Sequence, residues 1–426
     1  MHRCGISAAV ASSLLVSWSA AAEQQTPAPP DPQQWQMPHY DDGFVLISTP
    51  DPDTNPFRLK LKHVSQFKYT NTERVDDTWI DHLGREHEVQ KRHDIQLTRD
   101  VFYFQGFVFD RRLDFNILIF ISSATLSANA AGYAGYRFHP AFKLRAGYFS
   151  LPSMRGMAGT YPFFPGTDRG MALNYMRPGF TQGAWAEGEL FPGFNYLAMI
   201  GNSLNTLDLT AAVIDTEFAY SASVWYDHNE FGLAWNDWEY HDRLAMRLGG
   251  AATFAREDRL SDLSKAHPEN NSTFMSDGTL LFETGSLAPD ITVQRANVFL
   301  AAVDVGFKLR GLALNAEFYY RYLNEFEADG PLPITSMKDW GFEASLGYFV
   351  FRRRLEVYTR TSLIDGPFAT PFEAGGGVHW YPFDTRQVWL SLEAMGIKDC
   401  PYGSIYYAYA AGQTGLLVQS QFLLRF

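Results

Sequence analysis

Apolar and polar residues alternate along most of this chain with a period of two. In the last twelve residues, one strand face carries Leu416, Val418, Phe422, Leu424 and Phe426, and the other carries Gln419, Gln421 and Arg425. The same alternation recurs in residues 57–62, 113–122, 293–309, 312–322, 340–350, 355–360 and 388–394. Because successive side chains of a strand point to opposite faces, this pattern predicts many strands with one apolar and one polar face.

The connections between these segments are of two kinds. Some are a few residues long, as at Arg111-Arg112 and Arg310-Gly311, and others are long and polar, as in residues 71–90, 256–290 and 324–338. Short turns on one rim and long loops on the other are typical of outer-membrane β-barrels. We therefore predict an all-β, transmembrane, antiparallel β-barrel of 16 strands, with 18 strands as the second choice, because residues 57–426 then provide about 23 residues for each strand and its connection.

Composition agrees with strands rather than with membrane-spanning helices. Hydrophobic residues make up 46% of the chain, yet its mean hydropathy is slightly negative. The most helix-like stretch, residues 115–136, has no charged side chain, but polar residues dilute it and Gly132 and Gly135 interrupt it. A transmembrane helix needs about 20 predominantly apolar residues in a row, so we expect none here.

The N-terminal part predicts export. Residues 1–22 have a basic start, a short apolar run and a small-residue cleavage site at Ala20–Ala22, as in a signal peptide. Residues 23–56 are rich in Pro and Gln and read as a periplasmic linker or arm, either touching a neighbouring subunit or acting as a disordered spacer. The barrel then spans residues 57–426 in the outer membrane. A disordered leader on a cytoplasmic protein is the alternative for residues 1–22.

Part of the chain resembles a known family. Residues 133–152, followed by Thr167-Asp168-Arg169-Gly170 and Gln182-Gly183, are similar to the phosphate-selective porin O and P family, in which a strand of the type Leu-Arg-x-Gly-x-Phe-x-x-Pro precedes a loop rich in Arg, Pro and Gly. The resemblance implies a sixteen-stranded, usually trimeric channel for small anions. The partners expected from it are small anionic solutes, outer-membrane lipids and two further copies of the chain. The closing strand that ends at Phe426 is expected to engage the barrel-assembly machinery, and no nucleic acid is expected.

Charges on the polar strand faces indicate the selectivity of the lumen. The alternation places a set of cations there: Arg58, Lys60, Lys62, Lys143, Arg145, Lys308 and Arg321. It places acids on the later strands: Asp304, Glu317, Glu343, Glu356, Glu373 and Glu393. Fixed cations in a narrow aqueous pore favour anions, whereas the late acids give a transverse field as in general porins. The interpretation is an anion-leaning diffusion channel, with phosphate-dedicated uptake as the narrower alternative.

A connection inside the predicted barrel is unusually apolar. Residues 151–182 contain many apolar side chains, broken by Gly and Pro, so this segment must bury itself somewhere. Folding into the lumen would turn Arg155, Arg169 and Arg177 toward permeating anions, whose oxygens suit guanidinium groups. The alternative is that the segment packs on a neighbouring subunit, with its arginines paired to acids such as Asp168.

No motif predicts an enzyme, a metal site or a cofactor. Phosphate-binding and nucleophile-elbow motifs are missing from the sequence, and His82, His87 and His93 fit a metal cluster only loosely in what reads as a solvated loop. Two other classes remain as alternatives: an outer-membrane hydrolase of the esterase or phospholipase type with a Ser/His pair at the rim, and a secreted glycan-binding β protein. The sequence does not choose the solute, the gating or the number of subunits.

Overall fold

A computed structural model describes residues 38–49, 56–124, 126–157, 161–206, 217–259, 273–404 and 407–426. Within these ranges the chain is a closed antiparallel barrel of 16 strands, which confirms the predicted fold class and strand number. The barrel strands are β3 (Phe57–Val75), β6 (His93–Val108), β7 (Asp110–Ser122), β8 (Ser127–His139), β9 (Phe142–Ser150), β10 (Phe180–Phe191), β11 (Phe194–Gly201), β12 (Ala219–His228), β13 (Ala245–Asp258), β14 (Val293–Leu309), β15 (Leu312–Ala328), β16 (Ser336–Phe351), β17 (Leu355–Asp365), β18 (Phe372–Trp380), β19 (Val388–Lys398) and β20 (Gly415–Arg425). The predicted signal peptide lies outside the described residues.

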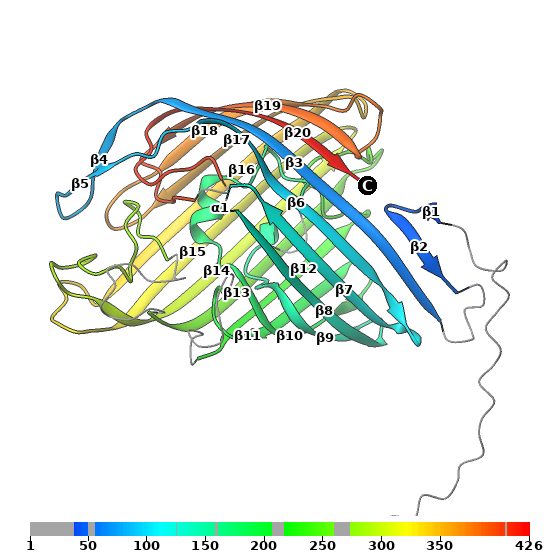
Figure 1. Cartoon of the computed structure of the whole chain (residues 1–426), viewed down its shortest axis with the longest axis horizontal. Helices are drawn as coiled ribbons and strands as arrows, with labels where there is room; N and C mark the ends of the chain where they lie inside the picture. The colour runs from blue at the N-terminus through cyan, green and yellow to red at the C-terminus, as the bar shows by residue number, and fades with distance from the viewer. Residues whose placement is uncertain are drawn as a thin grey trace, which may run out of the picture.

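The barrel closes between its last and first strands. β20 pairs with β3 from Arg425↔Val64 to Gly415↔Val75, and the backbone of Phe426 exchanges hydrogen bonds of 2.7 and 3.0 Å with His63. Figure 1 shows β3 and β20 side by side, with the C-terminus at the rim that carries the short turns. On the general rule for such barrels, this rim is periplasmic and the rim with long loops is external.

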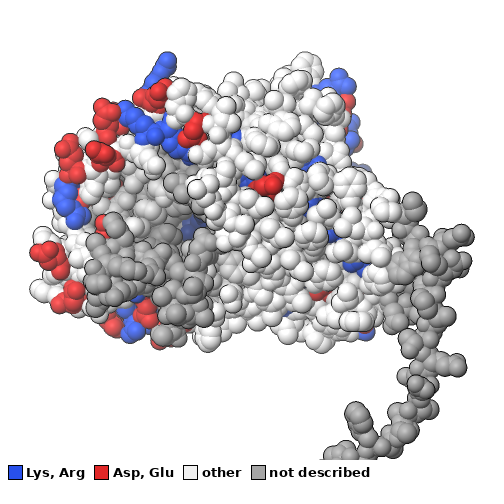
Figure 2. Space-filling view, in the orientation of Figure 1, with Lys and Arg blue, Asp and Glu red and all other residues white. Residues whose placement is uncertain are grey.

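The outward face of the barrel wall is apolar and exposed, and the inward face is polar and buried. On β16 the outward Phe342 is 37% exposed, whereas the inward Glu343 is only 3% exposed. Figure 2 shows the outer surface as a belt of mostly uncharged side chains between charged ends. Apolar outward and polar inward is the pattern of a wall in a membrane. The buried lumen side chains mean that protein fills much of the interior, and a soluble β-sandwich does not describe this fold.

Part of the predicted linker belongs to the sheet. β2 (Phe44–Ser48) pairs with β3 below the end of β20, and β1 (His39–Tyr40) pairs with β2. Asp41 and Asp42, in the turn of this hairpin, face cations of β3. The described part of residues 23–56 is therefore an ordered arm on the periplasmic end of the barrel wall.

Several connections differ from the sequence-based prediction. The prediction of a long loop at 324–338 is wrong at both ends, because β15 continues to Ala328 and β16 begins at Ser336. In the external loop after β3, β4 (Thr78–Ile80) and β5 (Glu86–Glu88) form a small hairpin. Residues 229–244, at the periplasmic rim, form a long connection that the prediction did not anticipate. Among the residues described, no helix combines the length and apolar character that a membrane crossing needs.

Candidate functional site

The connection between β9 and β10 crosses the barrel lumen. It contains a 3-10 turn (Arg155–Met157) and the short helix α1 (Met171–Met176), and Figure 1 shows α1 inside the barrel. Every residue of α1 is buried, and Leu151 at the start of the connection has no exposed surface. We call residues 151–179 the constriction segment. The segment is apolar because it packs against the inside of the barrel wall. This is the first of the two alternatives that the sequence left open, namely folding into the lumen.

One side of the constriction segment is bound to the acidic wall of the later strands. The backbone N–H of Met171 donates to Glu373 at 2.7 Å, and the N–H of Arg155 donates to Glu317 at 2.9 Å. The approach is so close that a Cβ atom on Gly170 would lie 2.3 Å from an oxygen of Glu343, so a side chain does not fit there without displacement. The late acids thus hold the segment through its backbone donors.

The other side is bound to the basic wall of the first strands. Asp168 accepts from both terminal nitrogens of Arg99 at 3.0 Å and from Lys68 Nζ at 2.7 Å. Burial alone would raise the pKa of the Asp168 carboxyl, but Arg99 and Lys68 lower that pKa well below its ordinary value. Asp168 therefore neutralises wall residues, and the expected pairing between Asp168 and the segment's own arginines is replaced by this one.

Three guanidinium groups gather around one phenol. Arg177 donates to the hydroxyl of Tyr407 at 3.1 Å, Arg169 donates to it at 3.5 Å, and Arg99 lies 5.2 Å from the centre of its ring. We call these four residues the arginine cluster. Within the described ranges, neither Arg169 nor Arg177 forms an ion pair with a carboxylate. Although burial raises the pKa of Tyr407, Arg177, Arg169 and Arg99 together lower it to about 8.

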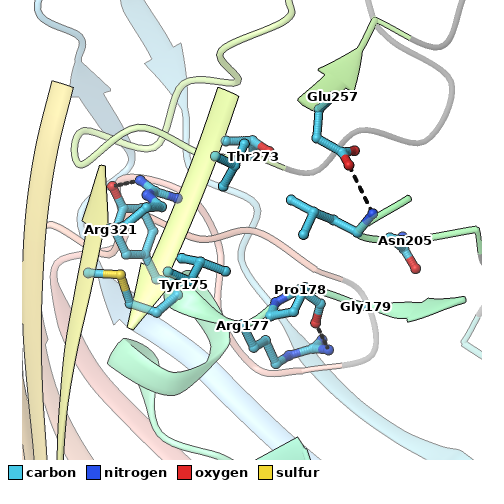
Figure 3. Close-up of a pocket in the computed structure, with 12 residues that line it drawn as sticks. Tyr175, Arg177, Pro178, Gly179, Asn205, Glu257, Thr273 and Arg321 are labelled. Carbon is cyan, nitrogen blue, oxygen red and sulfur yellow. Dashed lines mark hydrogen bonds between the residues drawn. The ribbon is translucent and has the colours of Figure 1, made fainter. Parts of the chain in front are cut away.

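A hollow adjoins the arginine cluster near the external ends of the strands. Figure 3 shows Arg177 in its wall, with its guanidinium turned to the carbonyl of Pro178. Opposite, Glu257 accepts from the backbone N–H of Leu204 at 2.9 Å. Arg321 donates to the hydroxyl of Tyr175 at 2.5 Å. Arg177 therefore lies at the surface of a cavity. Glu257 and Arg321, which also line this cavity, are bonded to Leu204 and Tyr175.

The other predicted cations are divided between several places. Arg58 and Lys60 pair with Asp41 and Lys62 pairs with Asp42, so these three lie at the periplasmic arm, away from the constriction segment. Lys143 and Arg145 both pair with Asp114, and Arg145 also pairs with Glu187. Arg321 pairs with Asp339 at 2.6 Å. Of the ten predicted residues, Arg169 and Arg177 are brought together in the cluster.

Arg155 and Lys308 meet at the periplasmic side of the constriction segment. Lys308 Nζ donates to the carbonyl of Phe231 at 2.6 Å, and Arg155 donates to the side chain of Asn315 at 2.8 Å. Both cations are almost fully buried and, among the described residues, neither has a carboxylate ion-pair partner. The segment that buries them, residues 229–244, is considered below.

Arg99 and Tyr407 are the cluster residues that sequence reasoning missed. Arg99 follows a β-bulge at Thr98, where Gln66 pairs with Arg99 and the next residue, Phe67, pairs with Leu97. Because Thr98 is extra, alternation counted from the N-terminal end of the strand would place Arg99 outward, whereas Arg99 lies inward and Asp100 outward. Tyr407 lies in the loop between β19 and β20, where no alternation of apolar and polar residues assigns a face.

A Ser, a His and an Asp meet on the outward face of the wall. His63 Nε2 lies 2.6 Å from Asp100 Oδ1 and 3.0 Å from Ser65 Oγ, and Ser65 also contacts Asp100. A catalytic triad needs the serine and the carboxylate on different ring nitrogens. Here both are on Nε2, and Nδ1 has no hydrogen-bond partner within the described chain. The cluster therefore does not have the geometry that the hydrolase alternative requires.

Metal chemistry gains no support from the described residues. Among them, no group of three or more His, Cys, Asp or Glu side chains is placed to hold an ion. His82 instead contacts Asp277 and His87 contacts Asp81, which ties the external β4–β5 hairpin to itself and to the loop before β14.

Comparison with known proteins gives the class of fold. No family model and no curated protein matches the sequence. Among solved structures, OmpT of Vibrio cholerae has a TM-score of 0.56 at 11% identity and covers 87% of this chain and 98% of that one. The anion-selective porin from Comamonas acidovorans has a TM-score of 0.53 at 12% identity, with 87% and 100% covered, and OmpF of Salmonella typhi has 0.51 at 12%, with 92% and 100% covered.

These similarities show an outer-membrane β-barrel with the fold of the porins. At such low identity they carry the architecture alone, and the resemblance to the phosphate-selective porin O and P family stays a prediction at the level of that family.

Proposed function

We propose that this protein is an outer-membrane porin that lets small anions diffuse passively through a constricted lumen. The observation that carries the proposal is the arginine cluster, in which Arg169 and Arg177 lie at the constriction and bind a neutral phenol rather than a carboxylate. Cations in a low-dielectric wall attract anions and repel cations more strongly than they would in bulk water.

The chemistry of the cluster supports oxyanions as the preferred solutes. Guanidinium groups bind phosphate or carboxylate oxygens through paired hydrogen bonds, and the Tyr407 hydroxyl now occupies the position between Arg169 and Arg177. A small oxyanion arriving there would replace one neutral acceptor by a charged one. The narrower proposal is therefore a preference for phosphate or small carboxylates over chloride.

The test is the reversal potential of the purified protein in a planar bilayer across a salt gradient. We expect anion selectivity in the wild type and a several-fold lower anion-to-cation permeability ratio in Arg169→Gln/Arg177→Gln. Arg112→Gln is the matched control, because Arg112 lies exposed near the start of β7 and pairs with Asp110. Cation selectivity of the wild type would refute the proposal. Reduction of chloride current by millimolar phosphate would separate an oxyanion-preferring channel from a general one.

We also propose that the protein assembles as a homotrimer through the outward face of β3, β6, β7 and β8. The Asp100–His63–Ser65 group lies on this face, and ionisable groups facing hydrocarbon are costly. The neighbouring outward positions of β8 are small, namely Ala128, Ala130, Gly132 and Ala134. Small side chains allow close approach of another wall, so a second copy of the chain is a better neighbour here than lipid.

A further inference from the structure

The periplasmic connection between β12 and β13 folds into the lumen. We call residues 229–244 the periplasmic insert. Phe231 and Asp237 have no exposed surface and Trp235 is 3% exposed, although a turn at a barrel rim is ordinarily solvated. The other connections described at this rim are much shorter, such as Arg310-Gly311. An insert of this length and burial does more than reverse the chain direction.

The insert meets the constriction segment. The N–H of Trp235 donates to the carbonyl of Phe163 at 3.3 Å, and the Arg155 guanidinium carbon lies 4.1 Å from the centre of a Trp235 ring. Arg155 also donates to the carbonyl of Ala234 at 3.4 Å. Two inward segments, one from each rim, therefore touch inside the barrel.

Backbone carbonyls of the insert accept hydrogen bonds from side chains that face the lumen. Lys308 donates to the carbonyl of Phe231, Asn315 donates to that of Trp235 at 2.8 Å, and Arg155 donates to that of Ala234. A carbonyl oxygen is a neutral acceptor, so it satisfies a buried cation less well than an anion does. These oxygens occupy places that a permeating anion could take.

The attachments to the wall are both aromatic and polar. The ring of Trp238 lies 4.7 Å from that of Tyr381 and 5.8 Å from that of Phe349, between ring centres. Asn236 donates to Glu356 at 2.8 Å and to the Tyr381 hydroxyl at 3.2 Å, and Arg386 donates to Asn236 and Glu239 at 3.1 and 2.9 Å. Asp237 accepts from the backbone N–H of Gly311 at 2.7 Å. These contacts favour the docked position, and an anion that binds Arg155 and Lys308 only when the insert is undocked shifts the insert away from it.

From these contacts we propose that the periplasmic insert is a tethered plug that competes with permeating anions for Arg155 and Lys308. When the insert is docked, its carbonyls hold both cations and the periplasmic exit is narrow. When it leaves, Arg155 and Lys308 extend the cationic path from the arginine cluster to the periplasm. The inference rests on the proposed function, which identifies the competing solute as an anion. It adds a second, regulated constriction at the periplasmic end of the lumen.

The first experiment compares channel conductance in planar bilayers. Trp235→Ala/Asn236→Ala removes the ring over Arg155 and the amide bonded to Glu356, and we expect a several-fold increase in mean conductance. Leu233→Ala is the matched control, because Leu233 lies in the same insert but is 50% exposed. A folded double variant with the conductance of the wild type would overturn the proposal. Circular dichroism and heat-modifiable gel mobility establish that the variant is folded.

A second experiment measures solvent access to the lumen wall at the insert, in the wild-type insert and in the double variant. Ala313 is 1% exposed on the lumen face and is the ladder partner of Lys308, so Ala313→Cys places a small thiol beneath the insert. We expect slow labelling by a charged, membrane-impermeant thiol reagent, faster in the Trp235→Ala/Asn236→Ala background and faster in inorganic phosphate. Labelling that is equally fast in all backgrounds, or absent from all, would overturn the plug. The reversal potential is a separate readout, so failure of anion selectivity and failure of the plug are distinguishable.

Discussion

Lys68 on β3 and Asp168 in the constriction segment form a buried ion pair, with Nζ 2.7 Å from Oδ2, between residues 100 positions apart in the chain. Arg99 on β6 completes the pair with two further hydrogen bonds. The lumen thus contains a charge-paired anchor that fixes the segment against the first strands. This anchor helps to place the next two residues, Arg169 at the cluster and Gly170 at the acidic wall.

Replacement of the anchor carboxylate should destabilise the protein. In Asp168→Asn the buried cations Lys68 and Arg99 lose their counter-charge, and breaking one partner of a buried pair costs about 3–5 kcal/mol. Urea titration of the barrel refolded in detergent measures the change in the free energy of unfolding. Asp110→Asn is the control, since it removes an exposed pair with Arg112, and we expect little change there. Equal stability of both variants would contradict the anchoring role of Asp168.

Selectivity should depend on cations without carboxylate partners more than on paired ones. Arg169→Gln/Arg177→Gln removes two charges that face a phenol, whereas Lys143→Gln/Arg145→Gln removes two that Asp114 and Glu187 already compensate. We therefore expect the first double variant to lower the anion-to-cation permeability ratio several-fold and the second to lower it much less. Reversal potentials in the same salt gradient measure both. The opposite ranking would place the selectivity filter near β9 instead.

Anion preference should fall as the pH rises through about 8. The pKa of Tyr407 is lowered to about 8, because Arg177, Arg169 and Arg99 outweigh its burial, so its phenolate appears between pH 7 and 9 and neutralises part of the cluster. Since the folded-state pKa is below the ordinary one, ionisation also stabilises the fold at alkaline pH, and that contribution is lost as the pH falls through about 8. Tyr407→Phe should have a reversal potential that is flat across this range. A wild-type profile that is equally flat would exclude Tyr407 as the titrating group.

Bulk on the proposed interface should prevent assembly. Ala130 lies outward on β8, and Ala130→Trp would hold two walls apart, so we expect monomers in size-exclusion chromatography with light scattering. Ala344→Trp is the matched control, because Ala344 lies outward on β16, on a different part of the wall. Trimers in both variants would mean that another face is the interface, and monomers in the wild type would refute the homotrimer.

Most of the wall could be predicted from the sequence because alternation is a local property. The strands from Val293 to Lys398 alternate almost without interruption, and each residue there needs only its neighbours to assign its face. The closing pair of β20 and β3 was also predictable, since the terminal strand has its own apolar face. The loop lengths predicted from the sequence were less accurate, because a polar stretch such as residues 324–338 can belong to strands that extend beyond the membrane.

The interior of the lumen could not be predicted in the same way. The alternation around Lys308 would be the same whether its ammonium group faced water or the carbonyl of Phe231. The path of residues 229–244 determines that it faces the carbonyl. The apolar character of the constriction segment did indicate burial. Its contacts with Glu373, Lys68 and Tyr407 join residues that are 202, 100 and 230 positions apart, and no local pattern encodes them.

The bulge at Thr98 has a consequence for how such a wall can change. Thr98 donates from its hydroxyl to Gln66 and is the single extra residue that separates the facing of Leu97 from that of Arg99. Deletion of Thr98 would make Leu97 and Arg99 consecutive, so regular alternation would keep Leu97 outward and Arg99 inward. The wall can therefore gain or lose this residue in a single step while the guanidinium beside Asp168 stays in the lumen.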